Sequence, residues 1–277
     1  MKQYKLFIAI LLAMLCLFAC TAAEEPTVYR SGDYKYVLLE DGTAEIFQYT
    51  GKAETLDVPD ALDGHQVTSI GNSAFYYCAS LTSITLPDSV TSIGDWAFYS
   101  CDSLTSITLP NSVTHIGANP FLSCEKLTAI HVSPRHPVLA TIDGVLFNKT
   151  EKKLICYPYA FTASSYAVPN GILSIGDNAF SYCDSLTSIT LPDSVTSIGD
   201  LAFFYCESLT SITLPDSLTS IGNFAFHSCR ALTSITLPDS LTSIGDWAFA
   251  SCDSLTSITL PDSVTSIGIM RSVTATP

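Results

Sequence analysis

The sequence predicts a β-rich solenoid in which short coils of chain stack on one another and share one core. The dipeptide Ile-Gly recurs with a 23-residue period in two runs, at Gly71, Gly94 and Gly117 and then at Gly176, Gly199, Gly222, Gly245 and Gly268. Apolar residues also keep a fixed phase within each unit. A period of this length is too short for a propeller blade or a helix pair, which leaves one coil of a solenoid.

The N-terminus reads as an export signal. Lys2 and Lys5 precede the apolar run Leu6–Phe18, which is too short to span a bilayer comfortably as a helix. The run closes on Leu17-Phe18-Ala19-Cys20, which resembles the bacterial lipoprotein box, and the resemblance implies cleavage before a lipidated Cys20. Cleavage of an ordinary signal nearby is the alternative interpretation.

The modules follow in order along the chain. After the signal and a polar tether, a hairpin turning at Glu40-Asp41-Gly42 covers the first coil, because open solenoid ends need a cover. A second hairpin interrupts the repeats. The predicted boundaries are 1–19 signal, 20–33 tether, 34–50 capping hairpin, 51–127 repeats, 128–172 irregular repeat with inserted hairpin, 173–268 repeats and 269–277 uncapped tail.

Each regular coil has the same predicted layout. In Ser83–Leu86 the apolar residues alternate with hydroxyl residues, the period-two sign of a strand with one buried face, and Pro87 ends it. A second extended piece leads to Gly94, after which Asp95 is expected to cap a single helical turn. The positions expected to face inward are Phe75, Cys78, Leu81, Ile84, Leu86, Val90, Ile93 and Ala97.

The repeat resembles a known family. Leu81-x-x-Ile84-x-Leu86 matches the opening of a leucine-rich repeat, and the longer phrase from Leu81 to Cys101 is similar to the BspA-type repeats of bacterial surface proteins. The resemblance covers about residues 56–268 and implies a leucine-rich-repeat solenoid, inserts of the kind seen at 128–172, and adhesion to host proteins or to other cells.

Composition and motifs exclude several classes of function. The chain has 12 basic against 26 acidic residues, a net charge of −14, which repels phosphate backbones and excludes nucleic acid as a partner. No catalytic motif, P-loop, dinucleotide fingerprint or paired-cysteine zinc signature occurs, so we expect no enzyme, cofactor or metal. The regularly spaced aspartates suit turns and caps better than calcium, which wants six to eight oxygens.

Seven cysteines share one phase, and two explanations stay open. Export would permit disulfides between neighbouring coils, whereas buried free thiols require no pairing and suit the odd count, and we favour the thiols. The seven are Cys78, Cys101, Cys124, Cys183, Cys206, Cys229 and Cys252.

The positions around Ala-Phe vary while the rest of the coil does not. Aromatic residues collect there, and exposed aromatics favour contact with protein or sugar, although packing between coils explains them equally well. The candidate contact residues are Trp96, Tyr99, Tyr182, Tyr205, Phe224, His227 and Trp247.

These observations together predict a lipid-anchored binding protein of a bacterial envelope, at the outer membrane or cell surface. The expected partner is a protein or glycan on a host or another cell, with the membrane contacted through the anchor alone. A structural scaffold of the envelope or periplasm, and an accessory that captures polysaccharide, are the alternative functions. The tail after Gly268 departs from the repeat, which indicates either a truncated or frameshifted reading frame or an end face that stacks on a partner.

Overall fold

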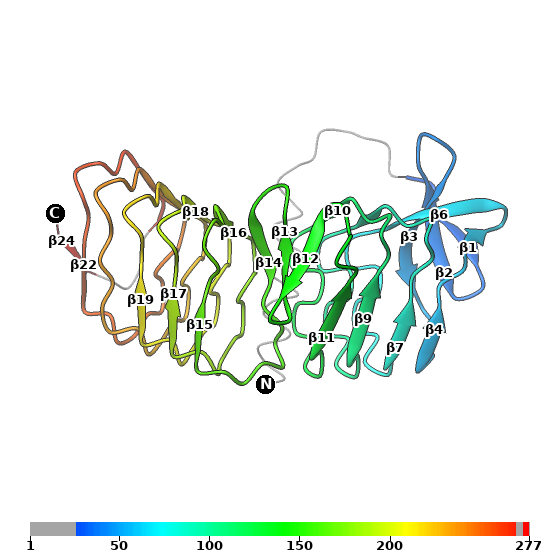
Figure 1. The fold of residues 1–277 in the computed structure, drawn as a ribbon, viewed down its shortest axis with the longest axis horizontal. Coiled ribbons are helices and arrows are strands. Elements are labelled where there is room, and N and C mark those ends of the chain that lie inside the picture. The colour runs from blue at the N-terminus through cyan, green and yellow to red at the C-terminus, as the bar shows by residue number, and fades with distance from the viewer. Residues whose placement is uncertain (1–25, 270–273, 277) are drawn as a thin grey trace.

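A computed structural model describes residues 26–269 and 274–276, and it confirms the solenoid (Figure 1). The coils stack along the long axis of the molecule, with parallel strands that pair in register from one repeat to the next. Apolar residues predicted to face inward are buried, including Phe75, Ile84, Val90 and Ile93. Cys78 is the exception among the inward positions, because it is half-buried at the start of its ladder.

Two strips of short parallel strands line the solenoid. One contains the Ser-Ile strands β6 (His65–Ile70), β8 (Ser92–Ile93), β10 (His115–Ile116), β16 (Ser174–Ile175), β18 (Ser197–Ile198), β20 (Ser220–Ile221), β21 (Ser243–Ile244) and β23 (Ser266–Ile267). The other contains the Ser-Ile-Thr strands and their equivalents, β4 (Thr55–Asp57), β7 (Ser83–Thr85), β9 (Ser106–Leu109), β11 (Ala129–Val132), β15 (Ser165–Ala167), β17 (Ser188–Thr190), β19 (Ser211–Thr213), β22 (Ser257–Thr259) and β24 (Thr274–Thr276).

An N-terminal hairpin precedes the first coil and pairs with it. Strand β2 (Tyr34–Leu38) pairs antiparallel with β3 (Ala44–Tyr49), and β3 continues the solenoid by pairing parallel with β6. A further strand, β1 (Tyr29–Ser31), lies within the stretch expected to be tether, because the Tyr29 ring stacks on Tyr36 at 5.4 Å. The two-residue strand β5 (Ala61–Leu62) pairs with β6.

The inserted hairpin divides the core in two. Strands β12 (Leu139–Ile142), β13 (Val145–Asn148) and β14 (Lys153–Cys156) form an antiparallel unit, and β14 then pairs parallel with β16. All four residues of β13 are buried. Val145 and Phe147 pack into the C-terminal core, whereas Leu146 packs into the N-terminal core, as expected for a strand buried on both faces.

The predicted helical turn after each Ile-Gly is wrong, since the described residues contain no helix of any kind. Successive β-turns replace it: the N–H of Ala74 donates to Gly71, that of Tyr76 to Ser73 and that of Cys78 to Phe75. The intervening N–H groups donate to the next coil, as Phe75 does to Ala97 at 2.7 Å. An Asp or Asn shortly before Ala-Phe is typical of a helix N-cap, which is why the sequence predicts a helical turn. The hydrogen bonds to the neighbouring coil instead hold this segment as successive β-turns.

The aspartates after each glycine bond between coils. The Oδ1 atom of Asp95 accepts the N–H of Ala118 at 2.7 Å, and Asn72 accepts the N–H of Asp95 in the same way. We call this row the Asx ladder; its other members are Asp177, Asp200, Asn223 and Asp246. The ladder explains the glycines, because a Cβ on Gly94 would lie 2.4 Å from the Asn72 Oδ1.

Candidate functional site

The candidate site is the side of the solenoid formed by the β-turns that follow each Ile-Gly, which we call the turn flank. Five of the seven candidate residues have a left-handed backbone there: Trp96, Tyr182, Tyr205, Phe224 and Trp247, with φ between 52° and 62°. This conformation is uncommon for residues other than glycine. It is held because the N–H of each residue donates to the next coil, as Tyr182 does to Phe204 at 2.8 Å.

Beneath the turn flank, a ladder of buried phenylalanines fixes the distance between coils. The ring centroids of Phe180 and Phe203 lie 5.1 Å apart, and those of Phe203 and Phe226 lie 5.0 Å apart. In the N-terminal half, Tyr49, Phe75, Phe98 and Phe121 stack in the same way, and Tyr157 restarts the ladder after the insertion. This rigid base positions the residues of the flank above it.

The aromatic residues of the flank differ in their access to solvent. Tyr76 and Tyr77 are 37% and 39% exposed, whereas Tyr99, in the same phase as Tyr76 and stacked on it at 5.2 Å, is only 1% exposed. Tyr99 therefore supports its neighbours and offers no contact surface. Tyr76 and Tyr77 share the variable aromatic positions with Tyr99, but Tyr99 and not they was the candidate predicted from the sequence. A shared phase does not reveal which member of a ladder is covered by the next coil.

The other candidates are half-buried and stack in pairs. Tyr182 stacks on Tyr205 at 5.5 Å, and Phe224 lies parallel to Trp247 at 6.5 Å. Trp96 does not join these pairs, and its Nε1 atom is buried without a hydrogen-bond partner, as is the Tyr182 hydroxyl. Trp96 and Tyr182 thus have the features of packing residues.

His227 joins the C-terminal aromatics. Its ring lies 5.2 Å from Phe204 and 5.7 Å from Phe224, and its Nδ1 atom is 2.9 Å from the Ser228 hydroxyl. Burial lowers the pKa of His227, with Arg230 adding to the effect, so the ring is neutral at pH 7. Neutral imidazole extends the aromatic surface without adding charge.

A row of acidic side chains, at the position after five of the seven ladder cysteines, accompanies the aromatics. Burial and then the neighbouring Glu207 raise the pKa of Asp184, and Arg230 lies 3.5 Å from Glu207 and 3.8 Å from Asp253. Burial raises the pKa of Tyr159, and the charges of Asp184, Glu125 and Asp102 raise it further. Carboxylates from both halves of the solenoid therefore converge near one tyrosine.

The turn flank runs past the insertion without a break. Asn119 and Asn178 are far apart in the chain, yet the Asn119 Nδ2 donates to the Asn178 carbonyl at 2.8 Å. Burial raises the pKa of Tyr182, and Tyr99 of the N-terminal half raises it further. The inserted strands lie among the Ser-Ile strands, away from this seam.

The remaining chemistry of the coils is structural. Ladder thiols donate to carbonyls of the preceding coil, as Cys206 does to Phe180 at 3.0 Å, and the eight described cysteines are free. Residues 26–269 hold no group of three or more metal-ligating side chains. His131 is exposed on β11, whereas His136 is buried with its Nε2 atom 3.1 Å from the Pro110 carbonyl. The lipidation candidate Cys20 lies outside the described residues.

Comparisons with known proteins agree with this architecture. A family model described as the BspA type leucine rich repeat region matches residues 43–163 and 155–270 in six copies. A leucine rich cell surface protein from Faecalibacterium prausnitzii is 26% identical over 91% of this chain and 97% of its own, with a TM-score of 0.60. The pneumococcal vaccine antigen PcpA has the same fold at 19% identity, covering 91% and 87% of the two chains, with a TM-score of 0.66.

A leucine-rich-repeat protein from Eubacterium ventriosum also shares the fold, at 24% identity over 88% of this chain and 85% of its own, with a TM-score of 0.53. No curated protein sequence matches significantly. Among the residues that the structure describes, none belongs to a helix with the length and apolarity needed to cross a membrane.

Proposed function

Because this chain belongs to the BspA-type leucine-rich-repeat family, we propose that it is an adhesin of the bacterial cell surface that contacts a protein partner through the turn flank. The similarity to a bacterial cell surface protein supports that location. Lipidation at Cys20 would hold the protein firmly at the membrane only if the cysteine carries more than one acyl chain, because a single acyl chain binds membranes reversibly.

The observation that carries the proposal is the aromatic surface of the turn flank. Tyr76 and Tyr77 are exposed at one end, while Phe224, His227 and Trp247 form a stacked group near the other. Aromatic residues dominate the energetics of protein interfaces because they bury large areas at small entropic cost. Rows of contacts on a stiff scaffold bind several points of a partner at once.

The acidic side chains indicate the charge of the partner. Asp102, Glu125 and Asp184 border the aromatics at the seam, and the whole chain has a net charge of −14. A partner surface rich in lysine and arginine complements both features, since cations bind carboxylates and also the faces of aromatic rings. We therefore expect adhesion to weaken at high salt.

The first test is location. Intact cells expressing the full chain are treated with protease and blotted for the repeat region, with a periplasmic protein as the internal control. Loss of the repeat signal with the control intact supports surface display. Protection of the repeat region contradicts the adhesin and favours the scaffold inside the envelope.

The second test is contact through the flank. Cells displaying the Tyr76→Ser, Tyr77→Ser double variant should adhere to cultured epithelial cells about tenfold less than wild type, the loss expected for an aromatic hot spot. The matched control is Thr85→Ser with Thr108→Ser, on the exposed Ser-Ile-Thr strip. If both variants adhere equally well at equal surface amounts, the two tyrosines do not contact the partner and their role is packing.

A further inference from the structure

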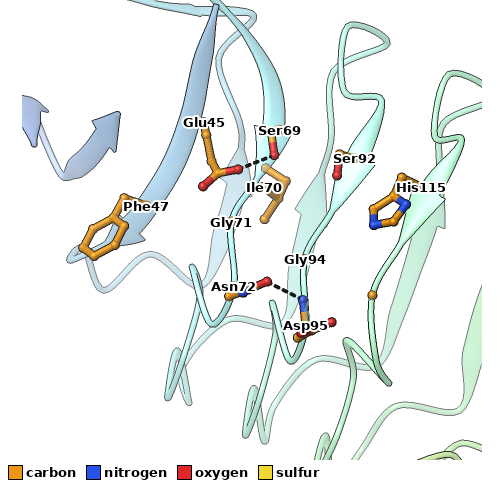
Figure 2. Close-up of a pocket in the computed structure, with 11 residues that line it drawn as sticks. Glu45, Phe47, Ser69, Ile70, Gly71, Asn72, Ser92, Gly94, Asp95 and His115 are labelled. Carbon is orange, nitrogen blue, oxygen red and sulfur yellow. Dashed lines mark hydrogen bonds between the residues drawn. The ribbon is translucent and has the colours of Figure 1, made fainter. Parts of the chain in front are cut away.

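A polar groove of about 440 Å³ crosses the first coils, and it uses none of the aromatic residues of the turn flank. Figure 2 shows its two rows of side chains: Glu45, Ser69, Ser92 and His115 form one, and Asn72 and Asp95 form the other. Between the rows lie Gly71, Gly94 and Gly117, which carry no side chain to fill the space. The glycines that the Asx ladder demands thus also form the floor of the groove.

Strand register sets the spacing of the first row. Glu45 is paired with Ser69, Ser69 with Ser92, and Ser92 with His115, so the four side chains occupy equivalent places on β3, β6, β8 and β10. Neighbouring strands in a sheet lie about 4.8 Å apart, so the row presents one polar group at each step of that length. A ligand lying along the solenoid axis meets these groups in succession.

Several of these groups are available to a ligand. The side chains of Ser92 and His115 make no hydrogen bond to any described residue, and His115 is exposed. The Glu45 Oε2 atom accepts the Ser69 hydroxyl at 2.8 Å, and its Oε1 atom has no partner among the described residues. Hydroxyl, imidazole and carboxylate together provide both donors and acceptors.

The chemistry of the groove selects the class of ligand. Glu45 and Asp95 disfavour an anionic ligand, and the strand backbones are already paired, so an added peptide strand has no free edge here. The alternating donors and acceptors suit a chain of hydroxyl groups. Phe47, which is 46% exposed at the end of the groove opposite His115, offers a ring face to the C–H groups of a sugar (Figure 2).

We propose that this groove binds a neutral β-1,4-linked oligosaccharide, with successive sugar rings lying across successive coils. The step between coils is close to the length of one pyranose unit in an extended β-1,4-linked chain, so one sugar ring meets one coil. Because successive rings of such a chain are flipped, each disaccharide of the ligand spans two coils. An α-1,4-linked chain of the same sugar curls into a helix and loses this register. The groove has the size of a small-molecule site, which allows a few sugar rings.

Calorimetric titration of the purified full-length chain with cellohexaose and with maltohexaose tests the proposal. We expect cellohexaose to bind and maltohexaose to bind about tenfold more weakly or not at all. Ser92→Arg, which fills the middle of the groove, and His115→Ala, which removes an open group at its end, should each weaken cellohexaose binding by about tenfold or more. Both side chains point away from the core, and thermal unfolding of each variant verifies the fold.

Ser220→Arg is the matched control, since Ser220 is half-buried at the same strand position in the C-terminal half, outside the groove. Its affinity for cellohexaose should equal that of wild type. The proposal is overturned if cellohexaose does not bind at millimolar concentration, if maltohexaose binds equally well, or if Ser220→Arg loses as much affinity as Ser92→Arg. Adhesion through the turn flank does not depend on any of these outcomes.

Discussion

Asn119 and Asn178 meet at the turn flank although the whole inserted module separates them in the chain, and the side-chain Nδ2 of Asn119 donates a hydrogen bond to the backbone carbonyl of Asn178 at 2.8 Å. Asn119 itself is almost fully buried. This bond joins the two halves of the solenoid where the inserted hairpin does not lie between them. One continuous flank, rather than two separate ones, is therefore available to a partner.

Asn119→Ala should destabilise the fold. The substitution leaves the Asn178 carbonyl without its donor inside the seam, which costs about 1–3 kcal/mol for a buried group. Urea unfolding followed by circular dichroism measures the loss. Asn111→Ala, in an exposed turn of the same half, should stay within about 0.5 kcal/mol of wild type. A loss no larger than that of the control would mean that the seam bond contributes nothing.

The Asx ladder makes Asp95→Ala and Asp95→Asn behave differently. Alanine removes the acceptor of the Ala118 N–H and should cost about 1–2 kcal/mol of unfolding free energy. Asparagine keeps an oxygen at that place, as Asn72 and Asn223 do in their own coils, and should be nearly neutral. Parallel urea titrations compare the two. Equal destabilisation would instead implicate the charge of Asp95.

Gly222→Ala tests why glycine follows each isoleucine. The added Cβ would lie 2.6 Å from the Asp200 backbone nitrogen and 2.6 Å from the Gly199 carbonyl carbon, so coils must move apart. We expect a loss of about 2 kcal/mol or more, typical of forced overpacking. Ser220→Ala, two positions earlier on the outward side, should be neutral. A stable alanine variant would show that the coil spacing adapts to a methyl group.

Peptide-resolved alkylation tests the state of the ladder cysteines. In the native protein, iodoacetamide should label Cys78, the half-buried member, faster than the buried thiols of the ladder. Burial raises the pKa of Cys252 to about 12 and also raises that of Cys206, while the hydrogen bond to Cys101 and then burial raise the pKa of Cys78. Thiolates are therefore scarce at all three cysteines, and the greater exposure of Cys78 is the reason to expect it to react first. All eight described cysteines should react after denaturation without reductant. Labelling that requires reductant would demonstrate disulfides.

His136 should make stability fall as the pH falls. Burial lowers its pKa below 6.5, with nearby Lys149 also lowering it, and its Nδ1 atom accepts the backbone N–H groups of Val138 and Leu139. Below pH 6.5 the unfolded chain takes up this proton more readily than the folded one, so acid favours unfolding. The urea midpoint should therefore drop between about pH 7.5 and 5.5.

His136→Gln separates this effect from the other titrating groups. The variant is expected to be less stable at both pH values but to lose less on acidification, because the lowered pKa of His227 then remains as a source of the loss. The raised pKa values of Asp177 and Asp184 act in the opposite direction in both proteins, since those carboxyl groups bind protons more readily in the folded chain. An equal drop in the variant would show that His136 is not its source and would leave His227 as the histidine with a lowered pKa. Thr128→Ser, at an exposed position, provides a neutral reference.

Much of this fold could be predicted from the sequence, since the fixed period of Ile-Gly and the phases of residues such as Ile84 and Val90 are direct signs of stacking. The β-turns after each Gly could not be predicted in this way. The carbonyl that accepts the Phe75 N–H belongs to Ala97, almost one full coil later, so no local pattern in the sequence indicates the bond. Tyr76 is more exposed than Tyr99 because exposure depends on which side chains of the next coil cover each ring.

The polar groove also escaped prediction, for a related reason. Glu45, Ser92 and His115 are far apart in the chain, and only the strand register brings them into one row. A signal was present, since Glu and His depart from the serine that most coils carry at that strand position. Such departures become informative once equivalent positions are aligned coil by coil.

The near identity of the C-terminal coils has a consequence for how the length of the solenoid can change. Gain or loss of one whole 23-residue repeat changes the protein by one complete coil. Each such event leaves every ladder in phase, because equivalent residues bond only to the coil before and the coil after. The inserted hairpin separates these coils from the groove at Glu45 and His115. Adding or removing C-terminal coils therefore lengthens or shortens the turn flank and leaves the groove unchanged.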